Sequence, residues 1–159
     1  MNVHLYEKIW MGLSAAVIAA FVLAILITSY AMGIHPPSHM ETIDPRTVST
    51  DPRFAHTGVR ARPDGSAEVV IVAAMWSFDP NEISVPAGKP VTFRLTSPDV
   101  IHGFEIAGTN VNTMVVPGYV SQLTTTFDHP GEYLIVCHEY CGVGHHMMSG
   151  KITVTGGGS

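Results

Sequence analysis

The sequence has few charged residues and few cysteines. Only 13% of its 159 residues are Asp, Glu, Lys or Arg, and 8 basic residues stand against 13 acidic ones. No run of Lys or Arg occurs, so nucleic-acid binding is not expected. An acidic surface can steer a basic partner, but ordinary solubility accounts for most of these carboxylates. Cysteine occurs only at Cys137 and Cys141, which leaves at most one internal disulfide.

One long segment contains no charged residue. Residues 9–34 are mostly apolar, and as a helix they would extend about 39 Å, against a bilayer core of roughly 30 Å. A cleaved signal peptide has an apolar region of only about 7–15 residues, so we predict an uncleaved membrane-spanning helix within residues 1–34. Trp10 and Tyr30 stand near its two ends, where aromatic side chains favour the membrane interface.

The charges that flank this segment predict its orientation in the membrane. Lys8 precedes the segment, whereas Glu41 and Asp44 are the first charged residues after it. Positive flanks stay in the cytoplasm, so we expect a cytoplasmic N-terminus and an outer location for the rest of the chain.

The remaining chain divides by composition. Residues 35–66 are rich in proline and lack periodicity, which predicts a tether, and residues 156–159 resemble a flexible linker. Residues 67–155 alternate short strand-like runs with Pro and Gly turns, which predicts an all-β sandwich or barrel. The predicted strands are residues 67–74, 82–85, 90–97, 100–106, 122–127, 132–137 and 151–155.

A dense group of potential metal ligands begins where the run 132–137 ends. Residues 137–148 hold two cysteines, three histidines and two methionines, with glycines that let the loop fold around a small object. Soft sulfur with imidazole is a donor set that copper prefers, and thioether in particular favours copper over zinc. His102 follows a turn-like Ser-Pro-Asp and is the best candidate for a ligand from another loop at the same end of the sandwich.

Three other arrangements are compatible with the residue types alone. A Cys137–Cys141 disulfide can form outside the cell, but it leaves the histidines and methionines unexplained. Two cysteines and two histidines can also make a structural zinc site. A mononuclear blue-copper site needs one thiolate, two imidazoles and a weak thioether, and it leaves one cysteine unused.

The motif and the upstream histidine resemble the binuclear CuA signature of cytochrome c oxidase subunit II. The likeness covers nearly the whole chain and is greatest to the B family of haem–copper oxidases, whose subunit II has one membrane helix. It continues through residues 97–104, 108–112, 117–118 and 130–133 in the same order. The residues that carry it are Cys137-x-Glu139-x-Cys141-x-x-x-His145-x-x-Met148 and His102-Gly103-Phe104.

The resemblance implies a cupredoxin-like Greek-key sandwich with two copper ions. It implies that Cys137 and Cys141 bridge both ions as thiolates. It further implies that His102 and His145 each bind one ion.

The resemblance also assigns the weaker ligands and a route for electrons. Met148 would be the thioether ligand of one copper, and the main-chain carbonyl of Glu139 would be the ligand of the other. The adjacent Met147 has a spacing that cannot by itself be distinguished from that of Met148. Trp76 and Phe78 fall in a segment that is aromatic in the family and lies where electrons enter.

The implied function is that of an oxidase subunit in the membrane of a prokaryotic cell, with its copper domain on the periplasmic side. Cytochrome c or a similar small redox protein would deliver electrons one at a time. They would pass to a haem in the large subunit I, where oxygen is reduced, so this chain would carry no catalytic residue. The alternatives are the copper domain of a nitrous oxide reductase, a quinol oxidase subunit, and a membrane-tethered copper-delivery or zinc-binding protein.

Overall fold

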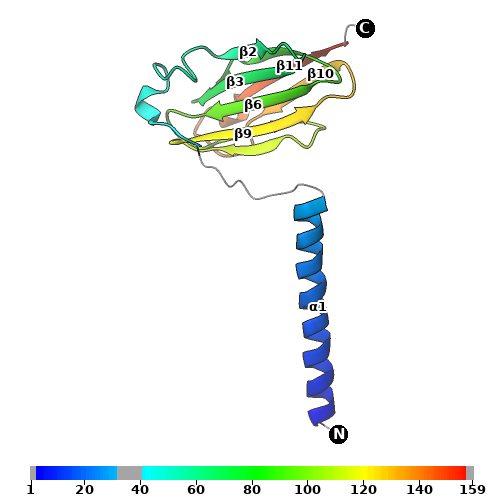
Figure 1. Cartoon of the computed structure of the whole chain (residues 1–159). Helices are drawn as coiled ribbons and strands as arrows, with labels where there is room; N and C mark the ends of the chain where they lie inside the picture. The colour runs from blue at the N-terminus through cyan, green and yellow to red at the C-terminus, as the bar shows by residue number, and fades with distance from the viewer. Residues whose placement is uncertain (1–2, 32–40, 157–159) are drawn as a thin grey trace. The chain divides into compact units, whose positions relative to one another are not determined.

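The computed structural model describes residues 3–31 and 41–156, which form a helical unit and a β unit (Figure 1). The helical unit is α1 (Val3–Ala31), and its span Val3–Tyr30 is long and apolar enough to cross a membrane. This confirms the predicted apolar helix, which begins earlier than the uncharged segment does. Residues 32–34 of the predicted helix lie outside the described residues.

The β unit is a sandwich of two sheets, as predicted. One sheet comprises β1 (Glu41–Thr42), β2 (Gly58–Ala61), β3 (Ala67–Ala74), β4 (Ser77–Asp79), β6 (Pro90–Thr96) and β9 (Tyr119–Thr126). The other comprises β5 (Glu82–Pro86), β7 (His102–Ile106), β8 (Asn112–Val115), β10 (Gly131–Val136) and β11 (Ser149–Thr155). The strand orders are β1-β9-β6-β3-β2, with β4 beside β3, and β5-β11-β10-β7-β8.

Each of the seven predicted strands is present, and period-2 alternation explains the clearest one. In β6, Val91, Phe93 and Leu95 are fully buried, while the residues between them face outward. The pairs β3–β6 and β5–β11 are parallel, and the consecutive strands β5 and β6 lie in different sheets. An alternating pattern predicts which residues of a strand face the core, but it does not predict which strands are neighbours.

A chain of aromatic contacts fills the space between the sheets. The Phe93 ring centroid lies 5.6 Å from that of Phe104 and 6.5 Å from that of Phe127. Phe78 meets Phe104 edge-on at 5.6 Å, and Tyr133 lies 5.3 Å from Phe127. Each fully buried Phe stabilises the fold by about 1.5–3 kcal/mol, so this core makes a stiff support for the loops at its ends.

The predicted tether over residues 35–66 is wrong for residues 41–66. These residues supply β1, which pairs with β9, and β2, which pairs with β3. Ile43, Val48 and Phe54 are buried in a second apolar cluster on the outer face of the first sheet. Because these apolar residues are irregularly spaced, their burial does not produce a periodic pattern. The prolines lie in turns and short helices, as Pro45 does at the start of the 3₁₀ helix η1 (Pro45–Thr47). Residues 35–40 lie outside the described residues.

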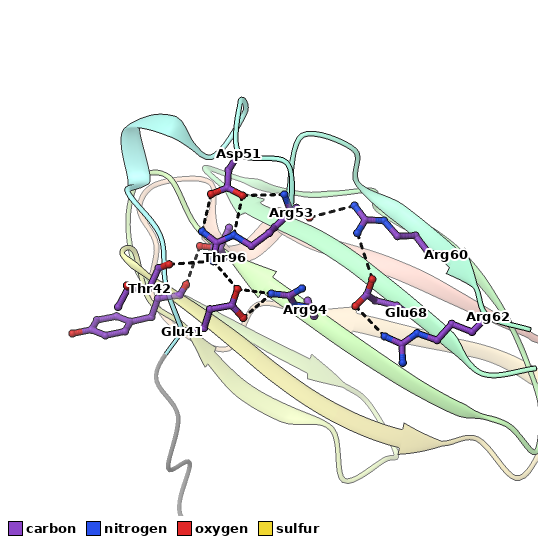
Figure 2. Close-up of polar contacts among 10 residues, drawn as sticks. Glu41, Thr42, Asp51, Arg53, Arg60, Arg62, Glu68, Arg94 and Thr96 are labelled. Atoms are coloured by element: carbon purple, nitrogen blue, oxygen red, sulfur yellow. Dashed lines mark hydrogen bonds and ion pairs between the residues drawn. The ribbon is translucent and has the colours of Figure 1, made fainter. Parts of the chain in front are cut away.

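Ion pairs attach this segment to the sheet. Figure 2 shows Glu41 between two arginines, with Arg53 Nη1 and Arg94 Nη2 each 2.6 Å from Glu41 Oε1. Arg53 also donates to both carboxylate oxygens of Asp51, at 2.9 and 2.7 Å. Glu41 is the first described residue of the β unit, and Arg94 lies on β6, the middle strand of the first sheet. The ion pair therefore bonds the start of the β unit to the centre of that sheet.

Candidate metal centre

Two segments far apart in sequence meet because β7 and β10 are neighbours in the second sheet. Cys137 follows the end of β10, and the antiparallel register pairs Val136 with Glu105 of β7. The chain beyond Val136 therefore runs toward the start of β7, where His102 lies. The loop 137–148 then returns through η2 (His145–Met147) to β11. Cys137 N donates to Met148 O at 3.2 Å, which closes the loop at its base.

The side chains of the predicted ligand set converge at this loop. Cys137 Sγ lies 3.8 Å from Cys141 Sγ, and a ring nitrogen of His102 lies within 4.8 Å of both sulfur atoms. Cys141 Sγ also lies 3.6 Å from His145 Nδ1 and 3.7 Å from Met148 Sδ.

The donor set fits a soft metal ion. Cys137, Cys141 and Met148 are buried, and the carbonyl oxygen of Glu139 lies 3.2 Å from Cys137 Sγ. Burial, with the neighbouring Cys137 thiol, raises the pKa of Cys141 to about 11, so two adjacent thiolates need a cation beside them. A disulfide requires sulfur atoms about 2.05 Å apart, and these are free thiols. Thiolate, thioether and imidazole together match copper.

Asp99 contacts His102 through one of its two ring nitrogens. Asp99 Oδ1 lies 2.9 Å from His102 Nε2, and the carboxylate can only accept, so Nε2 carries the proton. His102 is fully buried, and within the described residues its Nδ1 has no hydrogen-bond partner. An unpaired buried nitrogen is costly, and a metal ion beside the two sulfur atoms would satisfy it.

The sequence does not single out Asp99 as a functional residue, although it ends the turn that precedes His102. Its carboxylate also accepts hydrogen bonds from Met75 N at 2.7 Å and Val100 N at 2.6 Å. Burial opposes ionisation of Asp99, but the hydrogen bonds from His102 and these amides outweigh it and hold the pKa of Asp99 below its usual range. Asp99 therefore stays charged beside the centre.

The structure distinguishes the members of two residue pairs that the sequence alone does not distinguish. Trp76 is 42% exposed, and its Nε1 donates to the carbonyl of Cys141 at 3.2 Å, whereas Phe78 is buried in the core. Met148 is buried beside Cys141, whereas Met147 is 67% exposed.

Comparison with known proteins identifies the family. A family model for the periplasmic domain of cytochrome c oxidase subunit II matches residues 70–155. The chain belongs to the cytochrome c oxidase subunit II family. The chain is 40% identical to a cytochrome c oxidase subunit 2 of Thermus thermophilus over 153 residues. The match covers 94% of this chain and 91% of that protein.

Solved structures confirm the cupredoxin-like sandwich. The chain is similar to a chain of a heme-copper terminal oxidase dimer solved by cryo-EM, with a TM-score of 0.74 and 36% identity, covering 94% of this chain and 99% of that one. It shares its fold with the periplasmic domain of CoxB of Bradyrhizobium japonicum, with a TM-score of 0.52 and 21% identity over 56% of this chain and 83% of that one. The chain is therefore a subunit of a haem–copper oxidase, an oxidoreductase complex that includes subunit I. Its β unit is of the CuA type, and α1 indicates a membrane-anchored protein.

Proposed function

We propose that the β unit holds two copper ions and is the part of the oxidase at which electrons enter. Cytochrome c, or a similar small redox protein, delivers them one at a time. The electrons pass on to a haem in subunit I, where oxygen is reduced to water. The observation that carries this proposal is the pair of buried thiols 3.8 Å apart, with ring nitrogens of His102 and His145 close to them.

The number of donors supports two ions instead of one. A closed zinc site or a mononuclear blue-copper site takes about four protein ligands, and here six donor atoms lie together, the two cysteine sulfur atoms included. In the proposed centre Cys137 and Cys141, which lie 3.8 Å apart, would hold both ions, and His102 and His145 would each be a ligand of one. The two remaining donors, the thioether of Met148 and the main-chain carbonyl of Glu139, are the weak ligands.

The protein contributes a rigid support, the exclusion of water and the negative charge of Asp99 to this site. Two copper ions bound there supply a one-electron couple whose charge change is shared by two metals. The sandwich holds the cysteine loop at one end of its core, and the closed base of the loop, with Cys137 N bonded to Met148 O, limits its movement. Burial of both thiols keeps water away, and Asp99 fixes the orientation and tautomer of His102.

Trp76 is the proposed point at which electrons reach the centre. Its indole is partly exposed, and its N–H group bonds to the main chain of a proposed copper ligand, Cys141. Phe78 packs against Phe104 within the core, which supports a packing role for that second aromatic residue. Contact with the donor protein is expected to be small and transient, as redox encounters are.

The proposed topology places the centre on the periplasmic side of a prokaryotic cell membrane. α1 crosses the bilayer once, with Lys8 near its cytoplasmic end. Glu41 and Asp44, the first charged residues after the helix, then lie outside.

The test is a copper count and a spectrum of the full chain in detergent micelles. We expect two copper ions per chain, a near-infrared absorption band, and a paramagnetic resonance spectrum with one unpaired electron spread evenly over both ions. Cys141→Ser should abolish this spectrum, whereas Met147→Leu, an exposed sulfur control, should keep it. One copper ion per chain, or a preference for zinc, would contradict the proposal.

Co-expression with subunit I tests the partner. We expect the chain to co-purify with a haem-bearing subunit and to reduce that haem after mixing with reduced cytochrome c. A chain that binds metal but neither co-purifies nor cycles rapidly between redox states would instead be a copper-delivery or metal-stabilised binding protein.

A further inference from the structure

The Trp76 indole lies directly against the loop segment between Cys141 and His145. Its Nε1 donates to the Cys141 carbonyl at 3.2 Å. A Cβ atom added to Gly142 would lie 3.0 Å from Nε1, and one added to Gly144 would lie 2.6 Å from Cγ and 2.7 Å from Cε3. Real Cβ atoms do not come this close to a rigid ring, so the indole occupies the space in which a side chain at residue 144 would lie.

The backbone does not explain why residue 144 is glycine. Gly142 has a φ of +118°, a conformation that favours glycine by itself. Gly144 has φ −87° and ψ 7°, which other residues adopt in turns and at the ends of helices. What excludes a side chain at Gly144 is therefore the indole of Trp76.

The turn that carries Trp76 is itself attached to the other ligand segment. Met75 N donates to Asp99 Oδ2 at 2.7 Å, and Asp99 Oδ1 lies 2.9 Å from His102 Nε2. The β3–β4 turn is thus bonded to His102 through Asp99 on one side. On the other side it is bonded to Cys141 through Trp76. These hydrogen bonds connect the two segments that carry the proposed metal ligands.

We propose that Trp76 is a positioning residue that holds the cysteine loop closed over the copper centre, with Gly144 as the slot for its ring. This inference rests on the proposed two-copper function and adds a second role to the one in electron acceptance. The indole is partly exposed, lies against Gly144 and donates to the Cys141 carbonyl, so it slows metal release and fixes the position of the Cys141 thiol. Either role can exist without the other, and different measurements report on each.

The experiment compares copper-loaded full chains in detergent. Trp76→Leu removes the ring, Trp76→Phe keeps a ring without the N–H group, and Gly144→Ala fills the slot. We expect Trp76→Leu and Gly144→Ala each to speed copper transfer to a chelator about tenfold or more, as changes around metal ligands commonly do. Both should also shift the near-infrared band, and Trp76→Phe should have a smaller effect. Trp10→Leu, which changes an exposed tryptophan of α1, should leave the rate unchanged.

The double variant Trp76→Leu/Gly144→Ala decides whether the contact is the cause. Once the ring is absent, the alanine methyl group has room, so the double variant should release copper no faster than Trp76→Leu alone. Effects of the two substitutions that multiply would overturn the proposal. So would a Trp76→Leu chain that keeps the wild-type release rate and spectrum and is slowed only in electron acceptance. A wild-type chain that holds no copper pair would overturn the proposed function as well.

Discussion

His102 Nε2 lies 2.9 Å from Asp99 Oδ1, and this contact determines which nitrogen of the imidazole is free to bind a metal ion. The carboxylate holds the proton on Nε2 and leaves the lone pair on Nδ1. A negative charge behind the ring also makes the imidazole a stronger donor, which favours the more positive, oxidised state of a bound metal.

Asp99→Asn should therefore weaken copper binding and raise the reduction potential of the centre. The expected loss of affinity is about 10–100-fold, which is the usual effect of changing the partner of a metal-binding histidine. Chelator competition and potentiometry on the full chain measure the two effects. Asp128→Asn removes an exposed carboxylate in the loop between β9 and β10 and serves as the control. An Asp99→Asn chain with wild-type affinity and potential would show that Asp99 only shapes the turn.

Met148→Leu should keep two copper ions but shift their reduction potential, because Met148 is the buried thioether beside Cys141. Leucine has nearly the volume of methionine, so the fold should lose less than about 1.5 kcal/mol. Met147→Leu changes a side chain that is 67% exposed and should leave the potential unchanged. Potentiometry of the two variants distinguishes them, and a shift with Met147→Leu alone would reverse the ligand assignment.

Local patterns predicted the strands and the ligand motif, because both repeat or cluster over a few residues. The alternation in β6 and the spacing from Cys137 to Met148 are of this kind. The burial of Phe54 on the first sheet was not predictable, because it depends on partners far away in the chain.

The same limit applies around the metal centre. The Asp99 side chain resembles any turn carboxylate until the fold places Met75 N and His102 Nε2 against it. In the sequence, only the resemblance to the family distinguishes Met148 from Met147 as the ligand. In the structure, Met148 is buried and Met147 is exposed.

Gly103→Ala should destabilise the β unit, because the His138 ring lies against Gly103 as the Trp76 ring lies against Gly144. A Cβ atom at Gly103 would lie 2.6 Å from His138 Cγ, and both residues adjoin proposed copper ligands. Overpacking of this kind costs about 1–3 kcal/mol, so thermal unfolding of the copper-free chain should begin at a lower temperature. His138→Ala should remove most of that penalty. Gly156→Ala, where a new methyl group meets no atom within 4 Å, is the control. Equal penalties with and without the His138 ring would contradict this explanation.

The ion pairs of Glu41 should make the stability of the β unit depend on acid pH. Burial opposes ionisation of Glu41, but hydrogen bonds from Arg53 and Arg94 outweigh it and hold the pKa of Glu41 below its usual value. Hydrogen bonds from Arg53 lower the pKa of Asp51 to about 2. A carboxylate whose pKa is lower in the folded state than in the unfolded state stabilises the fold at pH values above its unfolded-state pKa. That stabilisation is lost as the pH falls through the folded pKa.

Thermal unfolding of the full chain in detergent should therefore show a wild-type midpoint that falls between about pH 4.5 and pH 2. Glu41→Gln should lower the midpoint at pH 7 and weaken its fall in acid, because the variant has one carboxylate fewer to protonate. The loss at pH 7 should be only about 1 kcal/mol, since Glu41 is partly exposed and water screens its ion pairs. Glu82→Gln, an exposed change on β5, should keep the wild-type pH profile. If Glu41→Gln also kept that profile, the ion pairs would contribute nothing to the attachment of residues 41–54.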